Sequence, residues 1–147
     1  MHEAAELFLA LDGDKKRAAC IRLCERALKV WEANFPDGYQ VVYQESVAGS
    51  TQVLDRGLPR EALASVRARV DEANISQRYL EPLAALQDDD LVLPAAAQSA
   101  YYAIYNTFQL YVRGRTIDEW TIVNQALSSV GTSAPGDVLS DVLREVI

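Results

Sequence analysis

Residues 15–35 carry apolar side chains at alternating steps of three and four residues, which is the spacing of one face of a helix. The stripe is made of Ile21, Cys24, Leu28, Trp31 and Phe35, and Pro36 ends it. A helix with one apolar side must bury that side against other elements, so the chain is predicted to be built around a helical core. Lys15, Arg22, Arg26 and Lys29 occupy the opposite side, which is interpreted as a solvated face.

The same spacing recurs along most of the chain and predicts further helices. They are expected at residues 4–11, 59–74, 75–86, 94–113, 116–131 and 139–146. Thr116 and Glu119 form a capping-box pattern that marks one helix start, and Gly131 marks its end. Pro82 must kink or restart the segment in which it lies.

Residues 38–57 carry a weaker pattern. Tyr43, Val47, Thr51 and Leu54 fit a helix face, and we predict a helix here. Gly49 lies in the middle of this segment, where it could break the helix or let a neighbouring backbone approach closely.

The 147 residues therefore predict a single all-α domain, 1–147, in which seven or eight antiparallel helices pack into one compact bundle. A short α-solenoid is the alternative, since stacked helical pairs show the same spacing. The N-terminus lacks the basic region and cleavage site of an export signal, and no apolar run approaches the ~20 residues of a membrane span. A cytoplasmic location is expected.

The inventory of reactive side chains is small and predicts no catalytic site, cofactor or metal. The only histidine is His2, and Cys20 and Cys24 are expected to be free thiols in the core. Asp118 and Glu119 are interpreted as helix-capping acids rather than catalytic carboxylates. The tyrosines between positions 101 and 111 could line a ligand pocket, although core packing is favoured for most of them.

Charge is distributed unevenly. The formal net charge is −7, which disfavours binding to nucleic acid or to an anionic membrane through overall positive charge. Residues 71–90 hold six acids and one base, and this excess predicts either a soluble surface or a patch that attracts a basic protein. The candidate partner-binding residues are the acids Asp71, Glu72, Glu81, Asp88, Asp89 and Asp90, with Tyr79, Tyr102 and Tyr111 as aromatic anchors at the rim of the core.

Three stretches resemble the all-helical immunity proteins of bacterial polymorphic toxin systems. They are the run from Arg17 to Asp37, Gly57-Leu-Pro-Arg-Glu61 and the alanine-rich, tyrosine-bearing segment after Pro94; Trp31, Glu32, Phe35 and Pro36 carry the signature. Members of that group are thought to bind and silence a cognate toxin delivered between neighbouring bacteria. The resemblance implies an inhibitor with a protein toxin as its partner.

The function expected from the sequence is thus neutralisation of a basic toxin, such as a nuclease, by occlusion through an acidic surface. The alternatives are a small-ligand-binding protein or carboxylate-based enzyme, and a helical adaptor or regulator. Exposed aromatic residues would also allow a homodimer.

Overall fold

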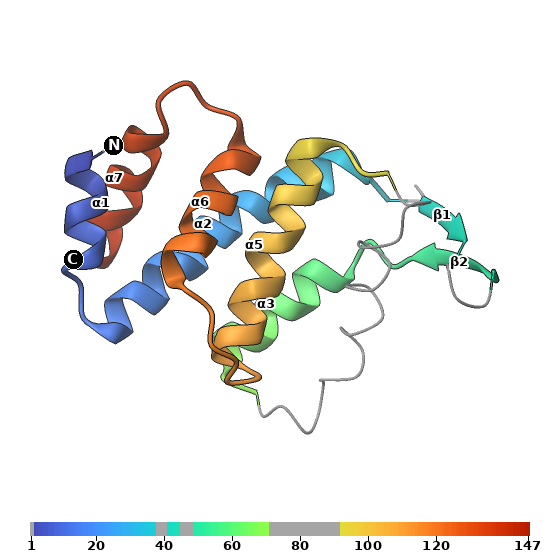
Figure 1. Ribbon diagram of the computed structural model, residues 1–147, viewed down its shortest axis with the longest axis horizontal. Helices are drawn as coiled ribbons and strands as arrows, with labels where there is room; N and C mark the ends of the chain where they lie inside the picture. The colour runs from blue at the N-terminus through green and yellow to red at the C-terminus, as the bar shows by residue number, and fades with distance from the viewer. Residues whose placement is uncertain (1, 38–40, 45–48, 71–91) are drawn as a thin grey trace.

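The computed structural model describes residues 2–37, 41–44, 49–70 and 92–147. This part of the chain is mostly helical and contains six helices and one two-stranded hairpin (Figure 1). The helices are α1 (His2–Leu9), α2 (Gly13–Asn34), α3 (Leu58–Ala68), α5 (Ala95–Tyr111), α6 (Glu119–Val130) and α7 (Pro135–Val146); the strands are β1 (Val41–Gln44) and β2 (Thr51–Leu54). The prediction of seven or eight helices is therefore wrong for the described residues, and the helix predicted at 75–86 lies outside them.

The hairpin stands where the sequence pattern predicts a helix. β1 and β2 pair antiparallel, with Val42 opposite Val53 and Tyr43 opposite Gln52. Both strands are rich in β-branched or aromatic residues, which favour extended backbone. Gly49, just before β2, has a φ of 68°, a conformation that glycine adopts without the penalty of a side chain. The helix prediction for residues 38–57 is corrected accordingly.

α2 is the longest of the described helices, and its start is fixed by the capping residue Asp12. The side chain of Asp12 accepts a hydrogen bond from the backbone N–H of Lys15 at 2.9 Å. The predicted stripe is confirmed, because all five of its residues from Ile21 to Phe35 are buried. Cys20 and Cys24 are fully buried free thiols, as predicted.

The described helices share one hydrophobic core, to which all six contribute together with Leu54 of β2. α5 packs against α2, α3 and α6, and α2 also contacts α6 and α7. Contacts between elements this far apart in sequence produce a compact domain, unlike a solenoid in which each repeat touches only its neighbours. Trp31 lies in the middle of this core, with its ring centroid 4.5 Å from that of Phe35 and 5.4 Å from that of Tyr101.

Several helix boundaries differ from the predicted ones. α6 is capped by the side chain of Asp118, which accepts from the N–H of Trp120 at 3.0 Å, and not by Thr116. α3 ends at Ala68 instead of Asn74, because Arg69 takes a left-handed conformation with a φ of 54°. Gly131 ends α6 with a φ of 63°, as predicted.

The molecule is elongated, and its two ends differ (Figure 1). α1 and α7 pack together at one end, which also holds both termini, while the hairpin projects at the other end. None of the helices in the described ranges combines the length and the apolar character needed to cross a membrane.

Candidate functional site

Most of the residues predicted to bind a partner lie outside the described part of the chain. This holds for all six acids of the predicted patch and for one tyrosine: Asp71, Glu72, Glu81, Asp88, Asp89, Asp90 and Tyr79. They remain a prediction from sequence.

The two other predicted anchors, Tyr102 and Tyr111, lie on α5 and are half-buried against the core. Tyr111 also makes polar contacts of its own. Its hydroxyl donates a hydrogen bond to the Glu119 carboxylate, and the guanidinium of Arg17 lies 5.7 Å from its ring centroid. Burial, with the nearby thiol of Cys20 and the Glu119 carboxylate, raises the pKa of Tyr111. Tyr111 thus links α2, α5 and α6.

The buried thiols are held in the protonated state. Burial raises the pKa of Cys24 to about 12, although a side-chain hydrogen bond with Thr107 partly opposes the shift. The Cys24 Sγ lies 3.2 Å from the Thr107 Oγ1. The pKa of Cys20 is also raised, chiefly by burial. Because the thiolate is the nucleophilic form, neither side chain is suited to covalent catalysis.

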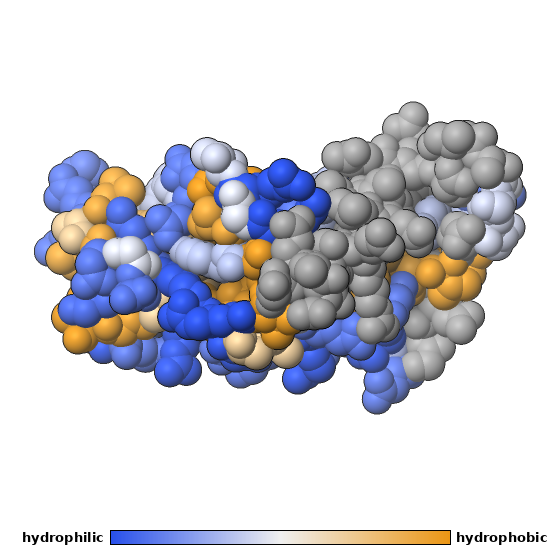
Figure 2. All heavy atoms as spheres, turned by 90° about the horizontal axis from the view of Figure 1, so that it is seen from below, coloured by the Kyte–Doolittle hydropathy of each residue, from blue (hydrophilic) through white to orange (hydrophobic). Residues whose placement is uncertain are grey.

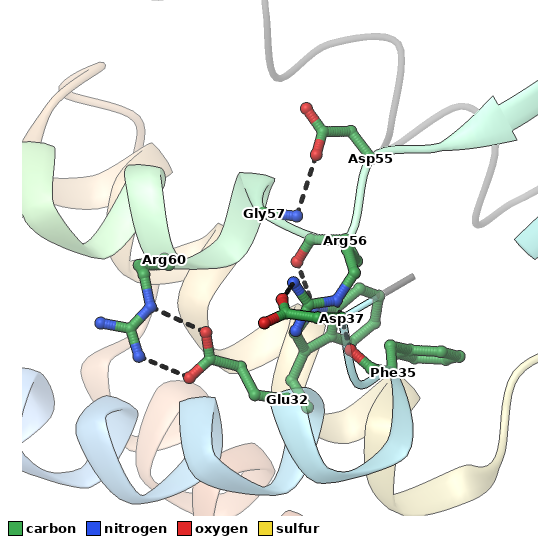
Figure 3. A network of polar contacts seen from close by, with 8 residues as sticks. Glu32, Phe35, Asp37, Asp55, Arg56, Gly57 and Arg60 are labelled. Atoms are coloured by element: carbon green, nitrogen blue, oxygen red, sulfur yellow. Dashed lines mark hydrogen bonds and ion pairs between the residues drawn. The ribbon is translucent and has the colours of Figure 1, made fainter. Parts of the chain in front are cut away.

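A network of polar contacts joins the end of α2 to the start of α3 at the base of the hairpin (Figure 3). We call it the hairpin anchor. Its members are Trp31, Glu32, Phe35, Asp37, Asp55, Arg56, Gly57 and Arg60. Two of the stretches that carry the resemblance, Arg17–Asp37 and Gly57–Glu61, therefore meet in space here.

Arg56 is the centre of the anchor. Its Nη1 donates to the Asp37 carboxylate at 2.8 Å, and its Nε donates to the carbonyl oxygen of Phe35. Its own carbonyl oxygen accepts from the indole Nε1 of Trp31 at 2.7 Å. Arg56, two residues after the end of β2, is thus bonded to the core tryptophan and to the chain beyond α2, which fixes the base of the hairpin.

Glu32 and Arg60 make the second contact of the anchor. The Arg60 Nε and Nη2 donate to the two carboxylate oxygens of Glu32 at 2.7 and 2.5 Å, a two-pronged ion pair between α2 and α3. The hydrogen bond from Arg60 lowers the pKa of Glu32, and the pair correspondingly raises the pKa of Arg60. The Arg60 side chain is 64% exposed, so the pair contributes little to the free energy of folding. Its main effect is to orient α3 relative to α2.

The hairpin has one inner side and one outer side. Leu54 on the inner side is buried, and Tyr43 packs against the core. Val42 and Val53 form a cross-strand pair on the outer side and are 57% and 52% exposed. Figure 2 shows hydrophobic surface at the end of the molecule that holds the hairpin.

Sequence reasoning missed the hairpin and its anchor. The available signal was two short segments rich in β-branched residues, Val41–Gln44 and Thr51–Leu54, on either side of Gly49. The spacing of Tyr43, Val47, Thr51 and Leu54 also fits one face of a helix, and this coincidence obscures the strand signal.

Three other features of the described residues bear on the sites considered from the sequence. The cavity between α3 and α5, lined by residues that include Tyr101 and Tyr105, is no larger than one water molecule needs. On the predicted basic face of α2, Lys15, Arg22 and Lys29 are exposed, as the interpretation of a solvated face expects. At the surface, Arg22 and Arg26 pair with Glu145 of α7 at 3.8 and 3.4 Å. Within the described ranges, no three His, Cys, Asp or Glu side chains lie close enough to hold a metal ion.

No family model matches the chain, and neither a curated protein nor a solved structure is significantly similar to it.

Proposed function

We propose that this protein is an inhibitor that binds a basic protein toxin and covers the surface with which the toxin acts. The proposal joins the resemblance to immunity proteins with the charge of the chain. A toxin that acts on nucleic acid presents positive charge, and an acidic protein can cover that surface.

The observation that carries the proposal is the division of charge along the chain. The described residues hold fourteen acids and thirteen bases and are nearly neutral. Of the remaining eight charged side chains, seven are acidic, and six of these fall within residues 71–90. A concentrated negative charge raises the association rate with a basic partner more than the same charge spread over the surface.

Two features of the described residues also support binding rather than catalysis. The raised pKa values of Cys20 and Cys24 keep both thiols protonated at neutral pH. The cavity beside Tyr101 and Tyr105 is far below the ~300 Å³ of an ordinary ligand site, so these two tyrosines do not line the ligand pocket considered from the sequence. Neither observation favours the enzyme or small-ligand alternative.

The test is co-expression with the polypeptide encoded immediately upstream of this protein's gene. That polypeptide should arrest growth when expressed alone and be harmless when this protein is present, and the two should co-purify. Reversal of three acids, in D88K/D89K/D90K, should abolish protection.

A matched control reverses three exposed acids on α1 and α7, in E3K/E6K/D141K, with the same change in net charge. This control should still protect. Protection that survives in D88K/D89K/D90K removes the acidic segment from the interface, and an upstream polypeptide that neither arrests growth nor binds this protein overturns the proposal. Detectable turnover of a small substrate by the purified protein would favour the enzyme alternative.

A further inference from the structure

We propose that the groove between α1 and α7 binds a basic, amphipathic helical segment of another protein. The groove lies at the end of the molecule that holds both termini, away from the hairpin (Figure 1). This inference does not rest on the proposed function, which places the contacts to the toxin in the acidic segment at 71–90. It gives the protein a second partner.

The groove has an acidic end and an apolar end. Its volume is about 390 Å³, which is room for several side chains of a docking segment, and both helices line it. α1 and α7 lie side by side and run in the same direction, as the dark blue and red helices of Figure 1 show. Glu3 and Asp137, from the first turns of the two helices, therefore lie at one end, with Leu7 and Ile147 towards the other.

The apolar end offers a contact surface for hydrophobic side chains. Leu143 is buried there, whereas Leu7 and Ile147 are 49% and 69% exposed. Figure 2 also shows hydrophobic surface at this end of the molecule. Exposed apolar side chains that gather in one groove between helices are typical of a site that takes the apolar face of a partner helix.

The acidic end determines the charge of the occupant. α1 and α7 carry five acids, and three of them already have basic partners: Glu6 with His2, Asp141 with Arg144, and Glu145 with Arg22 and Arg26. The other two are Glu3 and Asp137, and both line the groove. Within the ranges that the structure describes, neither of these two carboxylates makes a hydrogen bond or an ion pair.

The base that lines the groove does not neutralise these two acids. Arg144 pairs with Asp141 at 3.0 Å, so its charge is already balanced. A partner that places lysine or arginine at the acidic end supplies the missing counter-charges. The same partner covers Leu7 and Ile147 if apolar side chains lie on the same face as its basic ones, which describes a basic amphipathic helix.

A second copy of this chain is a poorer occupant of the groove. In a two-fold dimer formed through this surface, Glu3 and Asp137 would meet either the same acids or the apolar end of the other groove. Both arrangements leave the carboxylates without a basic partner while removing them from water, which is unfavourable.

The test uses the purified full-length protein and two synthetic, fluorescently labelled peptides of about four helical turns. One peptide carries leucines and lysines on the same face, in a background of alanine and glutamine, and the other has glutamates in place of the lysines. Fluorescence anisotropy should show saturable binding of the lysine peptide and at least about tenfold weaker binding of the glutamate peptide. E3Q/D137N and, separately, L7Q should each weaken binding of the lysine peptide about tenfold.

Each variant has a matched control on the same helices. E6Q/E145Q makes the same change in net charge with acids that do not line the groove, and L9Q changes a leucine that is 57% exposed outside it. Both should bind the lysine peptide as tightly as the wild type. All substituted side chains are exposed, so the variants should fold, and thermal unfolding checks this.

Three results would overturn the inference. The first is a lysine peptide that does not bind, or that binds E3Q/D137N as tightly as the wild type. The second is a wild-type dimer that L7Q dissolves, which would assign the groove to a second copy. The third is a loss of affinity for the upstream-encoded polypeptide in E3Q/D137N, which would place the toxin itself in the groove; we expect that affinity to be unchanged.

Discussion

Cys24 illustrates how burial determines the chemistry of one side chain. Its sulfur lies in the core beside Thr107 and the carbonyl oxygen of Ala103, at 3.2 and 3.5 Å. In this setting the thiolate would lose the solvation it has in water, so the pKa rises to about 12. The sequence predicted a buried thiol, and the structure adds a pH dependence.

We expect stability to fall as pH rises from 8 to 10. The unfolded thiol ionises near pH 8.5 while the folded Cys24 stays protonated, so the unfolded state releases a proton that the native state keeps. The contribution of Cys24 is therefore complete below about pH 8.5 and is lost progressively above it, by about 2 kcal/mol at pH 10. Urea unfolding at both pH values measures this loss.

Cys24→Ala is the control for that experiment. The substitution lowers stability at every pH by removing packed atoms, but the decrease between pH 8 and 10 should be smaller than in the wild type. Equal decreases in the two proteins would assign the pH dependence to other groups. Before unfolding, neither thiol of the wild type should react with a disulfide reagent at pH 8.

Gly131 is a residue whose backbone conformation decides where a helix ends. Its φ of 63° lies in the left-handed region, and no neighbouring atom restricts a side chain there. We expect Gly131→Ala to destabilise the protein by about 1 kcal/mol through backbone strain alone. Gly13→Ala, at the first residue of α2, also meets open space but has no positive φ, and it should be neutral or slightly stabilising in thermal unfolding.

The hairpin shows how two patterns compete within one segment. Four residues per strand are too few for a clear alternation, while the spacing of Tyr43, Val47, Thr51 and Leu54 fits a helix by coincidence. β-branched residues favour extended backbone locally, and Gly49, with a φ of 68°, does not continue a right-handed helix. The hairpin is further stabilised because Leu54 on its inner face is buried in the common core. This contribution comes from tertiary packing and leaves no local signal in the sequence.

The contacts of the hairpin anchor predict that substitution of Arg56 lowers the free energy of unfolding more than substitution of Arg60. The sequence alone does not distinguish these two arginines. Arg56→Lys should cost about 1–2 kcal/mol, because the loss of Nε leaves the Phe35 carbonyl without that donor and a lysine cannot make the forked contacts. Arg60→Lys should cost less than about 1 kcal/mol, since the Arg60 side chain is 64% exposed. The midpoints of urea unfolding measure both, with an unchanged m value as the check on two-state behaviour. Equal costs would contradict the central role given to Arg56.

For the whole molecule, the proposed function gives the excess negative charge one role, which is to raise the rate of association with a basic toxin. Attraction between an acidic inhibitor and a basic toxin acts over about 10 Å at 0.1 M salt. Under the proposed function, we expect the acids at 71–90 to affect the rate of association more than the rate of dissociation.

We expect the association rate constant with the upstream-encoded polypeptide to fall about tenfold or more between 0.05 and 0.5 M NaCl, with little change in dissociation. Stopped-flow or surface-binding kinetics measure both rates. D88K/D89K/D90K should flatten the salt dependence, whereas E3K/E6K/D141K should reduce it less. An association rate that does not depend on salt would contradict electrostatic attraction as the basis of recognition.

The helical class, the apolar face of α2, the buried thiols and the end of α6 at Gly131 were all predictable from sequence. Each of these features follows from local periodicity or from the conformational freedom of one residue. None of them depends on which distant residues are in contact. Helix starts were less predictable, because Asp118 and Thr116 both offer capping oxygens and only the path of the chain selects between them.

What tertiary structure alone decided is which distant residues meet. Three contacts illustrate this: the bond from Trp31 to the Arg56 carbonyl, the pairing of Glu32 with Arg60, and the bond from the Tyr111 hydroxyl to Glu119. Like the hairpin, they join segments whose separation in the sequence carries no periodic signal. Local propensities specify elements, but the pairing of polar groups depends on how those elements pack, because a side chain can bond only to what the common core brings within reach.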